Sequence, residues 1–154
     1  MSGRIEAKLA ELGVTLPAAP APAAAYVPFV VVGDLVFVSG QVSVGPDGPI
    51  KGKLGDDMSV EQGQAAAKVC ALNLLAQVKA ACGGDLDRLV RVVKLGGFVN
   101  STPDFDSHHL VINGASNFIG EALGEAAAHA RAAVGTSSLP LGVAVEIEGI
   151  FQIR

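Results

Sequence analysis

The sequence predicts a single α+β domain in which a six-stranded mixed sheet is covered on one face by two helices. Three observations lead to this prediction: short β-branched runs separated by turn residues, two long stretches with apolar residues at helical spacing, and the lack of an internal repeat or linker. The expected order of elements is ββ(β)αβαββ, which is typical of two packed layers. At 154 residues the chain is long enough for one such domain.

The first part of the chain is expected to lie outside this domain. We divide the sequence into an N-terminal segment, residues 1–25, and a folded body, residues 26–154. The segment begins with a short amphipathic helix whose expected N-cap is Ser2. The apolar residues of this helix are Ile5, Leu9 and Leu12. The Pro/Ala-rich residues 17–25 exclude regular structure and predict an extended strap over the surface.

A β-hairpin is expected at the start of the body. Two β-branched runs, residues 29–32 and 35–39, flank the turn sequence Gly33-Asp34. A loop rich in glycine and proline follows at residues 45–49, and a short third strand is expected near residues 50–53.

The first long helix is predicted from its capping signals. Ser59 is an N-cap with Gln62 three residues later, and Gly83-Gly84 ends the helix. Gly63 within it indicates close helix packing. A strand is expected at residues 90–99.

The second long helix is expected to run from Pro103 or Asp104 to Leu123. Its apolar residues at helical spacing predict the buried face. The expected buried residues are Phe105, Leu110, Ile112, Phe118 and Ile119.

The C-terminal stretch contains the candidate functional residues. Residues 143–153 alternate, with apolar side chains on one face and Glu146 and Glu148 on the other. Arg131 lies in a preceding strand of alanines and valines, where a lone buried charge would cost several kcal/mol. The residues leave two alternatives open: Glu146 or Glu148 neutralises Arg131, or the arginine lies at a pocket wall and binds an anionic ligand.

Composition excludes several classes of function. The net charge is −4, with 11 basic and 15 acidic residues and no basic cluster, so nucleic acid is not an expected partner. No apolar run approaches the length of a membrane span. Cys70 and Cys82 are separated by too much helix for a disulfide, which favours buried thiols and a cytoplasmic location. His108-His109 and His129 make a poor metal set, and no metal or cofactor is expected.

Several short motifs from Tyr26 to the C-terminus resemble, in their order and spacing, those of the RidA family, also called the YjgF/YER057c/UK114 family. They are Tyr26, Phe37–Gln41, Gly83-Gly84, Val92–Lys94 with Phe98-Val99, Pro103–Phe105, Arg131, Leu139-Pro140 and Val145–Glu148. The resemblance implies a chorismate-mutase-like fold and a homotrimer with three pockets at the subunit interfaces.

The resemblance also implies an activity: hydrolysis of reactive enamines and imines, such as 2-aminoacrylate, to a 2-keto acid and ammonia. Arg131 would hold the substrate carboxylate, Glu146 would orient or activate water, and Tyr26 would close the pocket. The substrate-positioning residues would be Ser39, Gly40, Asn113 and Ala133. Neither a metal nor a covalent nucleophile is needed, because an imine carbon is already electrophilic.

The sequence departs from the family pattern near the expected pocket. Ala133 replaces a cysteine that many members carry, which leaves only a main-chain role there. An insertion of about four residues around residues 110–116 makes Asn113 the candidate pocket asparagine. Two other functions stay open: a non-catalytic trimer that binds small carboxylates and, against the charge balance, an endoribonuclease or translation inhibitor.

Overall fold

The computed structural model describes residues 3–22 and 24–154, in which the main chain forms three α-helices and seven β-strands. The helices are α1 (Arg4–Glu11), α2 (Val60–Ala81) and α3 (His108–Leu123). The strands are β1 (Phe29–Val32), β2 (Leu35–Val42), β3 (Val44–Gly45), β4 (Gly48–Pro49), β5 (Leu89–Asn100), β6 (Ala130–Thr136) and β7 (Val145–Ile153). Short 3-10 helices cover Leu86–Arg88, Gly124–Ala127 and Pro140–Gly142.

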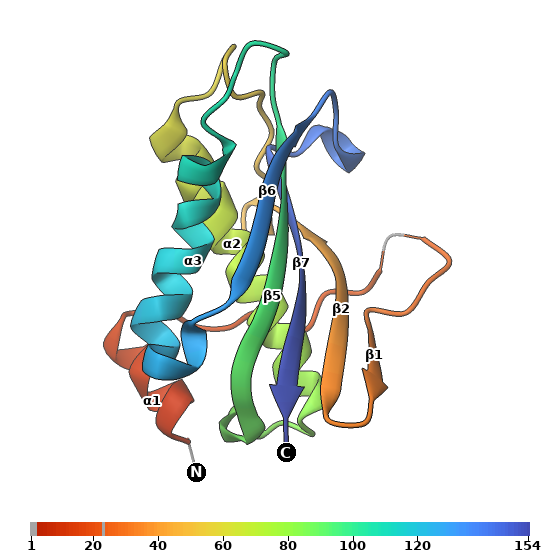
Figure 1. Ribbon diagram of the computed structural model, residues 1–154, viewed down its shortest axis with the longest axis vertical. Coiled ribbons are helices and arrows are strands. Elements are labelled where there is room, and N and C mark those ends of the chain that lie inside the picture. The colour runs from red at the N-terminus through yellow and green to blue at the C-terminus, as the bar shows by residue number, and fades with distance from the viewer. Residues whose placement is uncertain (1–2, 23) are drawn as a thin grey trace.

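The main sheet has five strands, in the order β1-β2-β7-β5-β6 (Figure 1). Neighbouring strands are antiparallel except for β5 and β6, so the predicted mixed α+β architecture is confirmed. The prediction of six strands is wrong: the sheet has five, and β3 and β4, at the loop expected around residues 45–49, form a separate two-stranded ribbon. The strand expected at residues 50–53 is reduced to an isolated bridge between Lys51 and Val143. The preceding Pro49 has no N–H to donate to a longer ladder.

The predicted β-hairpin is present, and it contains a feature that matters for the site. Gly33 takes a left-handed φ of 60° in the turn between β1 and β2. Further along β2 the pairing with β7 shifts between Val38 and Gln41, which makes a bulge at Ser39 and Gly40. The hairpin partner β1 ends before this point, so the upper part of β2 has a free edge.

Both long helices pack on one face of the sheet, α2 against β2 and β7 and α3 against β5 and β6 (Figure 1). The predicted capping box at Ser59 and Gln62 is confirmed, with both reciprocal hydrogen bonds present. Small residues let the two helices touch: a Cβ on Gly63 would lie 3.0 Å from a methyl group of Val111, and one on Gly114 would collide with the main chain of Gln64. The close packing predicted at Gly63 is therefore confirmed.

The second long helix starts later than predicted, at His108 rather than at Pro103 or Asp104. The intervening residues form a turn in which the Phe105 N–H donates to the Thr102 carbonyl. Leu110, expected in the core, is 41% exposed, whereas Ile112, Phe118 and Ile119 are buried as predicted. Phe105 is half-buried. The apolar periodicity extends beyond the helix because these turn residues also pack against the core.

The short N-terminal helix α1 is a third helix of the packed layer. Ile5 and Leu9 are each 2% exposed and belong to the main core, and α1 contacts α3. Its N-cap residue is Gly3, whereas the predicted cap, Ser2, lies outside the described residues. The Asp87 carboxylate, from the 3-10 helix Leu86–Arg88, accepts hydrogen bonds from the N–H groups of Arg4 and Ile5 at 2.7 and 2.9 Å. The division at residue 25 stays a prediction.

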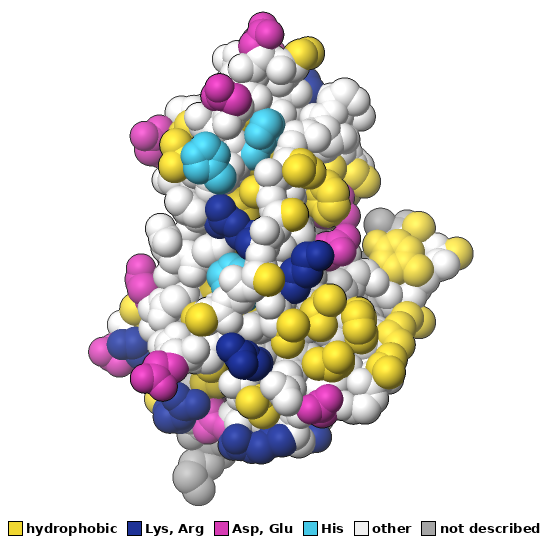
Figure 2. Space-filling model, viewed as in Figure 1, with side chains coloured by type: hydrophobic (Ala, Val, Ile, Leu, Met, Phe, Trp, Pro, Cys, Tyr) yellow, Lys and Arg dark blue, Asp and Glu magenta, His cyan; other side chains and the backbone are white. Residues whose placement is uncertain are grey.

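The opposite face of the sheet is left open by the helices. Hydrophobic side chains gather on it over β1 and the adjoining part of β2 (Figure 2). Val30, Val32 and Phe37 are the most exposed apolar residues of these two strands on this face, whereas Val31, paired with the buried Val36, is directed to the other. Among the described residues, no helix is long and apolar enough to span a bilayer.

We expect Asp87→Ala to lower the free energy of unfolding by up to about 1 kcal/mol near neutral pH, because the solvent-exposed carboxylate caps two N–H groups of α1. Those two hydrogen bonds also lower the pKa of Asp87. A lowered pKa means that the stabilisation is present above the ordinary value of about 3.9 and disappears as the pH falls through the folded-state value. Urea denaturation across this range measures the effect. Asp47→Ala, in the exposed β3–β4 turn, is the control, and an Asp87 effect that persisted in acid would contradict the assignment.

Candidate functional site

Arg131 lies on β6, at the edge of the sheet, and its guanidinium turns towards α3. One terminal nitrogen donates to Asn113 Oδ1 at 2.9 Å and to Ser116 Oγ at 3.1 Å, and the other donates to the His109 carbonyl at 3.2 Å. All three acceptors are neutral. Among the described residues, the ion pairs join Lys8 to Glu11 and Lys79 to Glu6, and none involves Arg131. The guanidinium is therefore oriented but keeps its charge unneutralised.

Ser116 and His129 are functional candidates that the sequence did not single out. Ser116 lies three residues after Asn113, so both face β6 from one side of α3. His129 precedes β6; its Nε2 lies 3.0 Å from Ser116 Oγ and its Nδ1 lies 2.5 Å from the Ala127 carbonyl. The spacing of Asn113 and Ser116, two polar residues three positions apart on one side of the helix, is the signal that could have revealed them.

The hydrogen bonds around His129 form one consistent chain. A carbonyl can only accept, so Nδ1 carries the proton and donates to Ala127. Nε2 of a neutral imidazole then accepts from the Ser116 hydroxyl, whose oxygen in turn accepts from Arg131. The chain holds the guanidinium in place without offering it a countercharge.

The main chain of Ala133 faces the free edge of β6. Thr136 directs its carbonyl towards β5, where it accepts from the Ser101 N–H. Alternate residues of a strand direct their main-chain groups to opposite sides, so Ala133, like Arg131, presents its N–H and carbonyl outward. Ala133 therefore offers polar groups close to the arginine despite its apolar side chain.

Glu146 lies on the other face of the sheet, on β7, which is paired with β2 and β5. Its carboxylate lies directly over Gly40, where any Cβ would collide with Oε1, so the bulge glycine is needed for this approach. Half-burial raises the pKa of the Glu146 carboxyl above its ordinary value, and the neighbouring charge of Glu148 raises it further. A carboxylate whose pKa is raised accepts a proton more readily than an ordinary glutamate.

A large cavity adjoins Glu146. Tyr26, Gly40 and Glu146 all line it, so the structure brings these three predicted site residues together. Ser39 is not among the lining residues, and its hydroxyl donates to the Val27 carbonyl at 2.8 Å. This bond fixes the approach of the Tyr26 segment to β2, which is a structural contact.

The predicted site residues thus fall into two groups at opposite edges of the sheet. Arg131, Asn113 and Ala133 lie at the β6 edge, whereas Tyr26, Gly40 and Glu146 surround the free edge of β2. Three strand spacings, or about 14 Å, separate β2 from β6. Neither Glu146 nor Glu148 reaches Arg131, so the alternative of an internal ion pair is wrong. Glu146 points to the face opposite the guanidinium.

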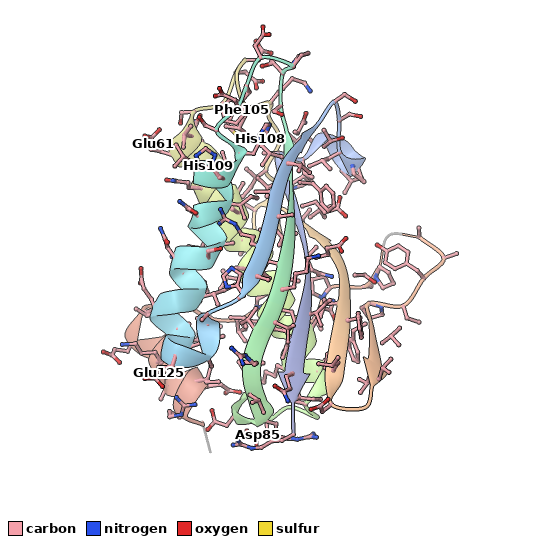
Figure 3. The ribbon with its side chains drawn as sticks, viewed as in Figure 1. Glu61, Asp85, Phe105, His108, His109 and Glu125 are labelled. Atoms are coloured by element: carbon pink, nitrogen blue, oxygen red, sulfur yellow. The ribbon has the colours of Figure 1, made fainter. Side chains whose placement is uncertain are left out.

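The remaining histidines and cysteines have structural contacts. Figure 3 shows Phe105, His108 and His109 together at the start of α3, and His108 Nε2 lies 3.2 Å from Ser101 Oγ. Cys70 and Cys82 are buried free thiols, as predicted. Within residues 3–22 and 24–154, no three histidine, cysteine or acidic side chains are arranged to hold a metal ion.

Comparison with known proteins identifies the family. A family model described as "YjgF/chorismate_mutase-like, putative endoribonuclease" matches residues 6–148. The chain belongs to this family, the RidA family. Protein TCP17 of Trypanosoma cruzi is 49% identical, with 99% of this chain and 96% of that protein aligned.

Two solved structures extend the comparison. The protein Atu1372 of Agrobacterium tumefaciens, described as having unknown function, has a TM-score of 0.91 and 52% identity, covering 97% of this chain and 92% of the other. TdcF of E. coli, solved with bound serine, has a TM-score of 0.64 and 27% identity, covering 90% and 97%. The predicted RidA membership and chorismate-mutase-like fold are therefore confirmed.

Neutralising Glu148 should lower the pKa of Glu146, because the Glu148 charge opposes ionisation of the neighbouring carboxyl. The pKa can be followed by carbon NMR of labelled glutamate side chains in wild type and Glu148→Gln, with Glu146→Gln to assign the signal. Glu125→Gln, at the far end of α3 (Figure 3), is the matched control and should have no effect. If the Glu146 titration were unchanged in Glu148→Gln, burial alone would account for the raised pKa of Glu146.

Proposed function

We propose that the protein hydrolyses reactive enamines and imines of the 2-aminoacrylate type to 2-keto acids and ammonia, at pockets between the subunits of a homotrimer. The observation that carries this proposal is the state of Arg131. Its guanidinium is held by three neutral oxygens, with no carboxylate among its partners in the described residues. Such a group is prepared to bind a carboxylate with two parallel hydrogen bonds.

The expected ligand resembles the molecule bound to a protein of similar fold. TdcF, a member of the same fold at 27% identity, was solved with serine, which carries a carboxylate and a nitrogen on one carbon. A 2-imino acid has the same two groups in the same relation. The net charge of −4 disfavours the endoribonuclease alternative, because RNA binding depends on cationic surface.

A trimer would unite the two groups of site residues. Within one chain the Arg131 group and the Glu146 group lie at opposite sheet edges, too far apart for one small ligand. If the β6 edge of one subunit lies against the open face and β2 edge of the next, a ring closes with one complete pocket at each interface. The exposed apolar side chains of β1 and β2 favour burial in such a contact (Figure 2).

Hydrolysis then needs only orientation and proton transfer. Arg131 of one subunit binds the substrate carboxylate, and the outward main-chain groups of Ala133 contact the ligand. An enamine first tautomerises to the imine. Glu146 of the neighbouring subunit takes a proton from water as the oxygen bonds to the imine carbon, and the proton passes to the nitrogen. In the resulting carbinolamine, Glu146 takes the hydroxyl proton and passes it to the amino nitrogen. The C–N bond breaks as the C=O bond forms, and ammonia and the 2-keto acid leave.

This chemistry suits the rest of the molecule. Tyr26, which lines the same cavity as Glu146, would close the pocket, and this hydrolysis needs no cofactor. The buried free thiols of Cys70 and Cys82 are typical of a protein in a reducing cytoplasm.

Arg131→Ala should lower kcat/KM for 2-aminoacrylate by about 10- to 100-fold, the value of a charge-assisted hydrogen-bond pair. Arg131→Lys should recover part of the loss, since it restores the charge but not the planar fork. The substrate is generated in situ, and pyruvate release above the spontaneous rate is recorded. Arg4→Ala, an exposed arginine of α1, is the control. Equal acceleration by wild type and Arg131→Ala would remove the arginine from the mechanism.

Mixing two inactive variants tests whether the site is shared between subunits. In a mixed trimer of Arg131→Ala and Glu146→Gln chains, one interface has both residues intact. Random association at equal amounts should therefore restore roughly a quarter of the wild-type activity. Each variant refolded alone is the control. No recovery despite mixed trimers, verified by mass spectrometry, would contradict the shared pocket.

A non-catalytic carboxylate-binding trimer would use the same arginine but not the proton-transfer group. In that case 2-keto acids would raise the melting temperature while wild type left the spontaneous rate of imine hydrolysis unchanged. This outcome separates the two functions.

A further inference from the structure

The cavity beside Glu146 is much larger than a small imino acid requires. Its volume is about 870 Å³, near the upper end of the range for small-molecule pockets. It is bounded by residues 15–18, 20–22 and 24 of the N-terminal segment, by the upper part of β2, by α2 and by the loop between β6 and β7. We call it the strap chamber, after the Pro/Ala-rich strap that forms one side.

The walls of the strap chamber are apolar and firmly held. Apolar side chains come from all four surrounding elements, among them Leu16, Pro20, Val69, Leu72 and Leu141. The buried Gln77 side chain donates to the Pro20 carbonyl at 2.6 Å and so fixes the strap on α2. Asn73 donates to the carbonyls of Val42 and Val44, which leaves its amide nitrogen engaged in the wall rather than free for a ligand.

Leu141 adds to this apolar lining in an unusual way. It is the one non-glycine residue with positive φ (62°) among the described residues, a conformation that costs about 1 kcal/mol for an ordinary side chain. Glycine or asparagine would adopt this conformation at lower cost. The residue is nevertheless a leucine, which is 58% exposed and lines the chamber. An apolar occupant of the chamber would cover it.

One end of the chamber is polar. Glu146 is its acidic lining residue, and its carboxylate lies over Gly40 beside Tyr26. A ligand that fits both ends of the chamber has an apolar portion and, at one end, a cationic or hydrogen-bonding group. A protonated 2-imino acid with a large side chain has this form, because its iminium group can meet Glu146 while its side chain fills the apolar part.

We propose that the strap chamber binds the side chain of the substrate, and that the preferred substrates are 2-imino acids with a branched aliphatic or aromatic side chain. The inference rests on the proposed imine hydrolysis and names its substrate class. The methylene group of 2-aminoacrylate would leave the chamber nearly empty, whereas a leucine- or phenylalanine-derived side chain would remove its walls from water. Even one methylene group in an apolar pocket typically changes specificity by roughly 10- to 200-fold.

The test compares imines of different size. An L-amino-acid oxidase generates the 2-imino acids of leucine, phenylalanine and alanine, and semicarbazide traps the imine that survives. For wild type, kcat/KM for the leucine- or phenylalanine-derived imine should exceed that for the alanine-derived imine by at least about tenfold. Ala18→Phe, which fills the chamber from the strap, should reduce this ratio by a similar factor.

The neighbouring Ala19 provides a matched control. Both alanines are exposed on the strap, but only Ala18 lines the chamber, so Ala19→Phe should keep the wild-type ratio. Equal rates for all three imines would overturn the inference but leave the proposed function intact, whereas no acceleration of any imine would refute the function itself. If Ala18→Phe instead weakened the trimer in sedimentation while the substrate ratio stayed the same, the chamber would hold part of a second copy, and the inference would fail.

Discussion

The unneutralised charge of Arg131 is the interaction on which the arrangement of this molecule depends. A guanidinium in a strand of small apolar residues needs hydrogen-bond acceptors, and α3 supplies them as an amide, a hydroxyl and a carbonyl. Neutral acceptors orient the group without cancelling its charge. The β5–α3–β6 crossover makes this possible, since parallel strands need a long connection and the helix within it packs beside the strand it leads into.

The alternation of side chains along β7 separates the Glu146 carboxylate from the Arg131 guanidinium. Glu146 alternates with buried residues of β7, so its side chain must lie on the open face, where the bulge at Gly40 leaves room for the carboxylate. Half-burial there keeps its pKa above the ordinary value. The two side chains consequently lie on opposite faces of one sheet, Glu146 on the central strand β7 and Arg131 on the edge strand β6. For the proposed hydrolysis, a chain with this division needs a second copy to complete the site, and cyclic symmetry is the simplest way to supply it.

The N-terminal segment contributes both to the core and to the cavity beside Glu146. Its helix closes the core through Ile5 and Leu9, and its strap forms a wall of the chamber beside Glu146. The same stretch of chain therefore stabilises the helix layer and sets the size of the space next to the carboxylate. Relatives that share the domain but differ in this segment are expected to differ in the ligands they accept.

Local signals in the sequence were sufficient for much of the fold. The capping box at Ser59, the hairpin turn at Gly33 and the alternation of β7 each depend on near neighbours in the chain, and each is present. The turn after Pro103 was mistaken for a helix start, and residues 50–53, which form only an isolated bridge, were mistaken for a sheet strand. Apolar periodicity cannot reveal where main-chain hydrogen bonds lead.

The sequence by itself determined the fold class and the family, and it proposed Arg131 and Glu146 as site residues, since these follow from residue types and spacings. Only the tertiary structure decided that these two residues do not meet, that Asn113, Ser116 and His129 hold the arginine, and that the strap encloses an apolar chamber. The physical reason is that the order of strands in a sheet, and the face to which each side chain points, depend on pairings between residues far apart in the chain.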